Sequence, residues 1–165
     1  MHKFQIIEAI VKIAPSLKID GDLVSAIVST ESAFNPYGVR YEPNYKWFNN
    51  PEKYAKLNGI TLETEIECQK MSWGSMQIMG STARDCGFNG ILTELSDIYQ
   101  GIYYGCLYLK KLTEKYPVMT DVISSYNAGS PVRTFSGEYK NKAYVQKVQK
   151  KYLDLLAINR GKKNG

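Results

Sequence analysis

The sequence predicts a single globular domain that is mainly helical, of the α+β class, with at most a small β element between residues 37 and 50. Three observations carry this prediction. Apolar residues recur at helical spacing through most of the chain, and no strong alternating strand pattern interrupts them. The length of 165 residues suits one domain. The apolar share of 44% and charged share of 22% are ordinary for a soluble globular protein, which argues against a disordered or collagen-like chain.

Helical spacing and stop signals predict each element in turn. The first helix carries an apolar stripe of Phe4, Ile7, Ile10, Val11 and Ala14, and we expect it to end at Pro15. The second begins at a cap on Asp20 or Asp22 and stops before Asn35. We expect the remaining helices at residues 51–59, 61–71, 81–87, 96–116, 120–129 and 139–158, followed by a frayed tail at 161–165.

Several of these helices have a candidate cap. Asn50 and Thr61 precede two of the short helices, and Thr120 or Asp121 precedes the helix that runs to residue 129. In the helix at 96–116, Gly101 and Gly105 are four residues apart. They therefore share one face and allow another backbone to approach closely.

Charge and composition narrow the possible partners only in part. The net charge of +5 favours polyanions, which include nucleic acid, acidic membranes and anionic cell wall. No recognised nucleic-acid motif is present, so we expect no nucleic-acid partner. No run reaches the ~18 apolar residues of a membrane span, so we expect no membrane insertion. Glu8 interrupts the apolar N-terminal stretch, which favours a folded helix over a signal peptide.

Cysteine and histidine usage predicts neither a disulfide framework nor a metal site. The odd set of Cys68, Cys86 and Cys106 contains no close pair, and His2 is the single histidine. We therefore expect free thiols, and no metal or other cofactor.

Glu31 is the first residue with a functional signature. It follows Val24 by seven positions and Ile27 by four, which places a carboxylate on the apolar face of the second helix. Burial disfavours the ionised form, so the pKa should rise and a protonated fraction should survive near neutral pH. A general acid for a glycosidic bond needs this property. The alternative is an ordinary ion pair with Arg40 or Arg84.

Four short motifs give Glu31 a context. In chain order they are STESAFNP, WGSMQIMG, SSYNAG and AYVQKVQ, and the helical segment GIYYGCLYLKKL lies between the second and the third. In order and spacing they resemble the lytic transglycosylases of the SLT type, which are relatives of goose-type lysozyme and similar to glycoside hydrolase family 23. The resemblance covers about residues 20–150 of a single catalytic domain at 1–165.

The resemblance implies a lysozyme-like fold and cleavage of peptidoglycan between N-acetylmuramic acid and N-acetylglucosamine. Glu31 would protonate the bridging oxygen and then take the proton of the 6-hydroxyl, which leaves a 1,6-anhydro product. Ser32 would orient the sugar or the site. Met76 and Gln77 would line the cleft, and the amide of Gln77 would offer a donor and an acceptor to an N-acetyl group.

Three further residues follow from the same resemblance. Tyr126 would hydrogen-bond to Glu31 or to the N-acetyl group, Asn127 would support the backbone on the substrate side, and Tyr144 would close the far wall of the cleft. Structural interpretations stay open for some of them: Met76 as core alone, Asn127 as a helix C-cap, and Tyr144 as packing.

The sequence departs from the family pattern in two places. Ser75 replaces an apolar residue, which predicts a more polar cleft floor. An insertion at about residues 40–72 supplies Tyr41, Tyr45 and Trp47 as candidate subsite residues. A small helical insertion that packs its own aromatic side chains is an equal alternative.

The insertion also contains the acids Glu42, Glu63, Glu65 and Glu67. If one of them approached the scissile bond, it would activate water and the enzyme would be a hydrolase, although the spacing of Glu63 and Glu67 fits a solvent-facing helix better. A hydrolytic muramidase and a non-catalytic wall-binding module are therefore the rival functions. With no signal peptide recognised, we expect a monomeric bacteriophage endolysin or virion-borne enzyme. It would be made in the host cytoplasm and act in the periplasm or cell wall.

Overall fold

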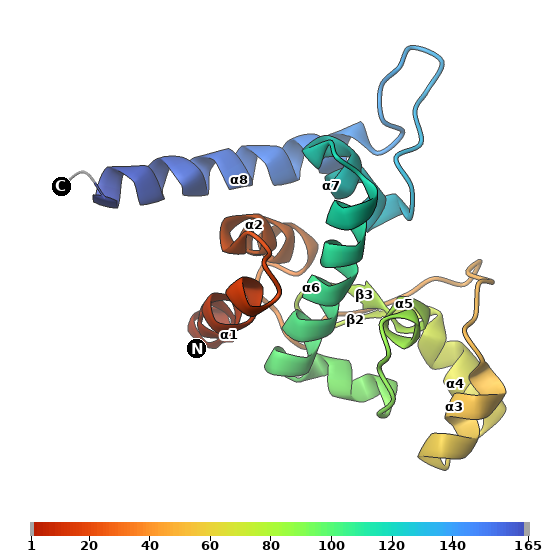
Figure 1. Cartoon of the computed structure of the whole chain (residues 1–165). Helices are drawn as coiled ribbons and strands as arrows, with labels where there is room; N and C mark the ends of the chain where they lie inside the picture. Colours follow the sequence, from red (N-terminus) through yellow and green to blue (C-terminus); the bar gives the residue numbers. More distant parts are fainter. Residues whose placement is uncertain (1, 164–165) are drawn as a thin grey trace.

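The computed structural model describes residues 2–163 and confirms a mainly helical single domain with a small sheet (Figure 1). The described part contains eight α-helices, one 3₁₀ helix and three strands. In chain order they are α1 (His2–Ser16), α2 (Gly21–Glu31), β1 (Val39–Tyr41), α3 (Pro51–Asn58), α4 (Leu62–Gln69), β2 (Met71–Trp73), β3 (Ile78–Met79), α5 (Gly80–Asp85), η1 (Leu92–Ser96), α6 (Ile98–Lys115), α7 (Met119–Ala128) and α8 (Lys142–Lys163).

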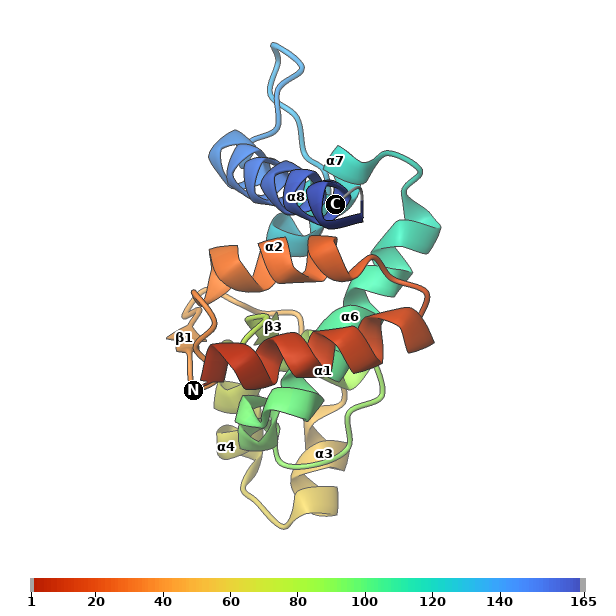
Figure 2. The same ribbon diagram turned by 90° about the vertical axis from the view of Figure 1, so that its left-hand side faces the viewer.

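The helices form a main body around α6, and the short sheet lies to one side of it (Figures 1 and 2). Helix α1 packs on α6, α2 packs on α8, and α7 contacts both α6 and α8. The three antiparallel strands run in the order β1-β2-β3, with Arg40 opposite Ser72 and Trp73 opposite Ile78. One apolar cluster fills the space among α1, α2, α6, α7 and α8, and a smaller one lies between the sheet, α5 and η1.

The predicted β element is confirmed by β1, whereas β2 and β3 lie outside the expected window. Both predicted side-chain caps at Asp20 and Thr61 are present: Asp20 accepts from two backbone N–H groups, and Thr61 accepts from one. Asn50 occupies its cap position without a side-chain cap bond. The α7 prediction is wrong at its start, because the helix begins at Met119 and no side chain caps it.

The predicted apolar face of α1 is confirmed at Ile10 and Ala14 and wrong at its other three residues. The buried side chains are Ile6, Ala9, Ile10 and Ala14, whereas Phe4, Ile7 and Val11 are exposed. The helix also passes through Pro15 and ends one residue later.

Helix α8 reaches Lys163, so the prediction of a frayed tail is wrong for residues 161–163; residues 164–165 lie outside the described part. Polar contacts dock this helix on α2. The Lys151 Nζ atom donates to the Ser29 carbonyl at 2.7 Å, and the Tyr152 hydroxyl donates to Asp20. This docking brings the start of α8 to the end of α2, where Glu31 lies.

A buried ion pair organises the region around α4 and α5. Arg84 donates from Nε and Nη2 to the two carboxylate oxygens of Glu65, each at 2.9 Å, and both side chains are fully buried. The guanidinium also donates to the carbonyls of Phe88 and Gly90 and lies over the Tyr54 ring. These contacts occupy the guanidinium, so Arg84 is not available to pair with Glu31.

The two glycines of α6 permit the predicted close approach. A Cβ on Gly101 would lie 2.6 Å from the Leu95 carbonyl oxygen, and one on Gly105 would lie 2.7 Å from the Met76 Cβ atom. Only a residue without a side chain fits at such distances. The second contact packs α6 against the segment that carries Met76 and its neighbour Gln77.

Candidate active site

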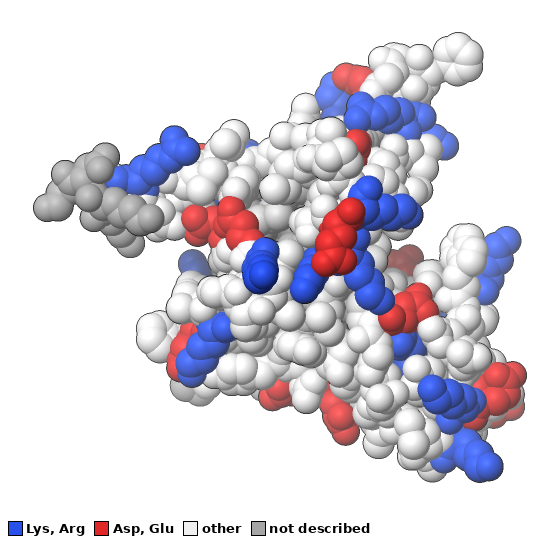
Figure 3. All heavy atoms as spheres, viewed as in Figure 1, with Lys and Arg blue, Asp and Glu red and all other residues white. Residues whose placement is uncertain are grey.

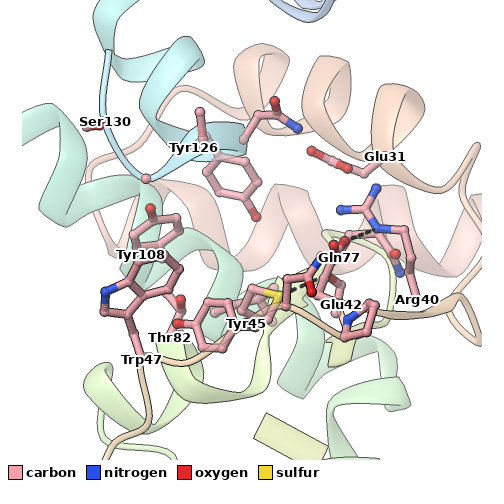
Figure 4. A pocket seen from close by; sticks show the side chains of 18 residues that line it. Glu31, Arg40, Glu42, Tyr45, Trp47, Gln77, Thr82, Tyr108, Tyr126 and Ser130 are labelled. Atoms are coloured by element: carbon pink, nitrogen blue, oxygen red, sulfur yellow. Dashed lines mark hydrogen bonds and ion pairs between the residues drawn. The ribbon is translucent and has the colours of Figure 1, made fainter. Parts of the chain in front are cut away.

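A cleft of about 760 Å³ opens between the sheet and the C-terminal end of α7. Figure 3 shows the molecule hollowed at this place, with acidic and basic side chains near its mouth. Figure 4 shows the lining side chains, which come from the α2 end, the β1 region, the β2–β3 region, α6 and α7. The lining residues are Glu31, Arg40, Glu42, Pro43, Asn44, Tyr45, Trp47, Ser72, Gln77, Ile78, Met79, Thr82, Tyr108, Tyr126, Asn127, Ala128, Gly129 and Ser130.

Glu31 is the last residue of α2 and lies half-buried in the cleft (Figure 4). Burial raises the pKa of its carboxyl above the ordinary value, against the lowering effects of Tyr144, Arg40 and Lys147. The hydroxyl of Tyr144 donates to Glu31 Oε1 at 2.6 Å. Tyr144 therefore holds the carboxyl, a role that differs from the cleft wall expected for it.

Ser32 fastens the helix end that carries Glu31. Its Oγ donates to the Ser75 carbonyl at 2.7 Å and also lies 3.2 Å from the Val28 carbonyl oxygen. The next two residues, Ala33 and Phe34, both have positive φ, at 51° and 63°. Such backbone costs about 1–3 kcal/mol per residue and tends to cluster at functional sites. This turn redirects the chain from α2 toward β1.

Gln77 lines the cleft as predicted, but its amide is only partly available. The Nε2 group donates to the carbonyls of Gly38 at 2.9 Å and Gly74 at 3.0 Å, which engages both of its hydrogens. The expected donor to an N-acetyl group is therefore occupied, and only the carbonyl oxygen remains. Met76, by contrast, is fully buried core, so its expected place in the cleft lining is wrong.

Tyr126 lines the cleft, but its hydroxyl does not reach Glu31. It donates to the Met76 carbonyl at 2.9 Å instead, so the predicted bond to Glu31 is wrong. Burial raises the pKa of this phenol well above its ordinary value. Its ring lies 5.3 Å from that of Tyr108, another lining residue, which fixes the two rings as one wall.

Asn127 lies in the last turn of α7, exposed and on the cleft. Its Oδ1 accepts from Asn141 Nδ2 at 3.0 Å, which ties the end of α7 to the start of α8. The αL cap of this helix is Gly129, whose φ is 76°. The C-cap of α7 is therefore Gly129 and not Asn127, and Asn127 lines the cleft.

Two predicted residues lie elsewhere. Ser75 is buried behind the cleft and is not part of its lining, so the expected polar floor is wrong at this position. Tyr41 is exposed and lies beside Glu67 and Lys70, also outside the cleft.

Tyr45 and Trp47 do line the cleft (Figure 4). Their rings pack edge to face with centroids 5.4 Å apart, and the Tyr45 hydroxyl is hydrogen-bonded to Ser81. Trp47 nevertheless leaves 67% of its surface exposed. The insertion thus forms a small helical unit with α3 and α4 and places this loop on the cleft, and the binding of sugar by Tyr45 and Trp47 stays a prediction.

One ion pair inside the cleft was not predicted as a pair. Arg40 lies in the middle of β1, and its Nε is 2.6 Å from the Oε1 of Glu42. The sequence pointed to each residue separately, to Arg40 as a possible partner of Glu31 and to Glu42 as a possible activator of water, but it gave no reason to pair the two. Of the other insertion acids, Glu65 is buried with Arg84, and Glu63 and Glu67 do not line the cleft.

The remaining chemical features of the described residues are few. Cys68, Cys86 and Cys106 are free thiols. Among residues 2–163, no three His, Cys, Asp or Glu side chains gather as metal ligands would. No helix in that range has the length and apolar character to cross a bilayer.

Comparison with known families shows to which family the chain belongs. The family model described as Transglycosylase SLT domain matches residues 8–149, which include Glu31, Gln77 and Tyr144. The chain belongs to this family. It is accordingly a lytic transglycosylase, an enzyme of peptidoglycan degradation. Comparisons with curated proteins and with solved structures gave no match.

Proposed function

We propose that this family member cleaves the β-1,4 bond between N-acetylmuramic acid and N-acetylglucosamine, with Glu31 as the single acid and base. The observation that carries the proposal is the environment of Glu31. Burial raises its pKa, and one of its two oxygens is held by Tyr144. A carboxyl whose pKa is raised and which is held in a cleft meets the two requirements of a general acid.

The proposed reaction has two steps. In the first, protonated Glu31 donates its proton to the bridging oxygen, and the glycosidic bond breaks with its electron pair leaving on that oxygen. In the second, ionised Glu31 takes the proton of the muramic acid 6-hydroxyl as that oxygen bonds to the anomeric carbon. The product is the 1,6-anhydro sugar, and Glu31 returns to its protonated form.

The neighbouring groups support both steps. Tyr144 donates to Oε1, so Oε2 is the oxygen through which Glu31 would exchange the proton with substrate. The hydrogen bond from Tyr144 favours the ionised form, which is the form left after the first step. Gln77 lines the cleft with both amide hydrogens engaged, so its carbonyl oxygen is the group that would accept the N–H of an N-acetyl group.

The experiment combines one substitution with product analysis. Glu31→Gln should lower the rate at which bacterial wall suspensions clear by at least a hundredfold. Binding to walls in a pull-down should persist. Glu63→Gln, at an exposed carboxylate outside the cleft, is the matched control and should clear walls like the wild type. Mass spectrometry of the wild-type digest should find anhydromuramic ends. Full clearing by Glu31→Gln would refute the role of Glu31, and an absence of anhydro ends would refute the transglycosylase chemistry.

We further propose a biological setting. The protein would be a monomeric bacteriolytic enzyme of a bacteriophage, an endolysin or a virion-borne enzyme, made in the host cytoplasm and acting on the wall. Two observations support this setting. The family degrades peptidoglycan, and the net charge of +5 attracts anionic wall polymers. Expression in a bacterium should cause lysis only when a pore-forming protein is co-expressed. Lysis without the pore would contradict the proposed dependence on release.

A further inference from the structure

The ion pair of Arg40 and Glu42 lies inside the cleft and faces Glu31 (Figure 4). Side chains two residues apart on an extended chain point to the same side, and here both point into the cleft. In the close-up, the carboxylate of Glu31 comes from the α2 side, and the Arg40–Glu42 pair faces it from the β1 side. The charge of Arg40 reaches Glu31, whose pKa it lowers.

This ion pair contributes little to the stability of the fold. The Arg40 and Glu42 side chains are 58% and 39% exposed, and ion pairs at that exposure contribute little to folding. The buried pair of Glu65 and Arg84 is the structural one in this protein. The position of Arg40 and Glu42 next to the proposed acid therefore calls for a chemical explanation.

A glycoside hydrolase has a second carboxylate near the scissile bond, whereas the transglycosylase reaction proposed here uses one. In inverting glycosidases, the second carboxylate takes a proton from water while the first protonates the leaving oxygen. Among the residues described in this structure, Glu42 is the one carboxylate besides Glu31 that lines the cleft. The Arg40 guanidinium, however, holds its Oε1 at 2.6 Å and so fixes the direction in which this carboxylate points.

We propose that Glu42 is a latent general base for water and that Arg40 restrains it, so that the ion pair sets the ratio of anhydro to hydrolysed product. The inference rests on the function proposed for Glu31. When Arg40 is paired, the 6-hydroxyl attacks the anomeric carbon. When the pair is broken, a water oxygen forms the bond to that carbon, Glu42 takes the water proton, and Glu31 supplies its proton to the departing oxygen. The product then carries a reducing muramic acid.

The test measures that ratio in variants of the whole chain. Arg40→Gln frees Glu42, and Arg40→Gln combined with Glu42→Gln removes the restraint and the base together. Lys70→Gln is the matched control, because it breaks another 2.6 Å ion pair, with Glu67, outside the cleft. Digestion of purified peptidoglycan in ¹⁸O-labelled water, followed by mass spectrometry, separates labelled reducing ends from unlabelled anhydro ends.

We expect Arg40→Gln to raise the labelled share at least fivefold, the double variant to return it to the wild-type value, and Lys70→Gln to leave it unchanged. Arg40→Met removes the same charge with a different shape and should behave as Arg40→Gln does. An unchanged share in both Arg40 variants would overturn the inference. A share that stays raised in the double variant would also overturn it, because water would then react without Glu42.

The two proposals fail in different ways. If the wild type and Lys70→Gln yield no anhydro ends at all, the transglycosylase chemistry proposed for Glu31 is wrong. If they yield anhydro ends and the Arg40 variants yield the same proportion, only the role of Arg40 and Glu42 is wrong. The pH profile adds a separate readout: loss of Arg40 raises the pKa of Glu31, so activity should persist to higher pH in the Arg40 variants.

Discussion

Removal of one hydroxyl, in Tyr144→Phe, tests how the catalytic carboxyl is held. The phenol donates to Glu31 Oε1 at 2.6 Å, and the substitution deletes this bond while it keeps the ring. A hydrogen bond to a charged group contributes about 1.5–3 kcal/mol. Since about 1.4 kcal/mol corresponds to a factor of ten, we expect the rate to fall by about 10- to 100-fold. The loss should come mainly from the first step, in which Glu31 gives up its proton and becomes ionised.

The same substitution should move the pH profile in a defined direction. The Tyr144 bond lowers the pKa of Glu31, which burial raises, so its removal lets the pKa rise further. Cleavage needs protonated Glu31, and activity declines as pH rises through that pKa. In Tyr144→Phe this alkaline decline should therefore begin at higher pH than in the wild type, although the maximal rate is lower.

The assay is the initial rate of release of soluble fragments from purified peptidoglycan, measured from pH 4 to 9. Tyr152→Phe is the matched control, because this tyrosine also lies on α8 and donates to a carboxylate, that of Asp20, away from the cleft. The control should retain the wild-type rate and pH profile. A Tyr144→Phe rate within twofold of wild type at every pH, with an unmoved alkaline limb, would refute the proposed hold on Glu31.

Four further predictions follow. Because burial raises the pKa of Glu31, its stabilising contribution is full below the unfolded pKa of about 4.3 and is lost as pH rises through the folded pKa. Glu31→Gln should thus melt higher than wild type at pH 8 and equally at pH 4, in thermal scans. Glu65→Gln leaves the Arg84 charge buried and should cost about 3–5 kcal/mol in urea unfolding. Gly105→Ala should cost about 1–3 kcal/mol by overpacking in the same assay. Trp47→Ala should raise KM about fivefold for the loss of about 1 kcal/mol of aromatic contact, with kcat little changed.

Periodicity predicted the helices well but not which of their faces is buried. Helix α1 has two apolar stripes, one through Ile6 and Ala14 and the other through Phe4 and Val11, and the sequence alone ranks them equally. Packing on α6 and α2 selects the first. In α2 the face that carries Val24 and Ile27 is buried, as the spacing predicted. The position of Glu31 on that same face could therefore be predicted from the sequence.

The members of the cleft were harder to predict where they depend on contacts distant in sequence. The need of the buried Tyr126 phenol for a partner was foreseeable, but a backbone carbonyl 50 residues away satisfies it in place of Glu31. Strands β2 and β3 have three and two residues, too few for alternation to show. Without them, nothing in the sequence places Arg40 in the cleft and Tyr41 outside it.

The position of Glu31 at the end of its helix adds to the effect of burial. The C-terminus of a helix carries a partial negative charge, which disfavours a nearby carboxylate by about 0.3–1 kcal/mol. Glu31 is the last residue of α2, and the left-handed backbone at Ala33 and Phe34 ends the helix there. Burial and the helix end therefore both favour the protonated acid, while Tyr144 and Arg40 favour the ionised base. A residue that must serve as acid and then as base needs such opposed influences. Without Tyr144 and Arg40, the surroundings of Glu31 would favour only the protonated form that begins the first step.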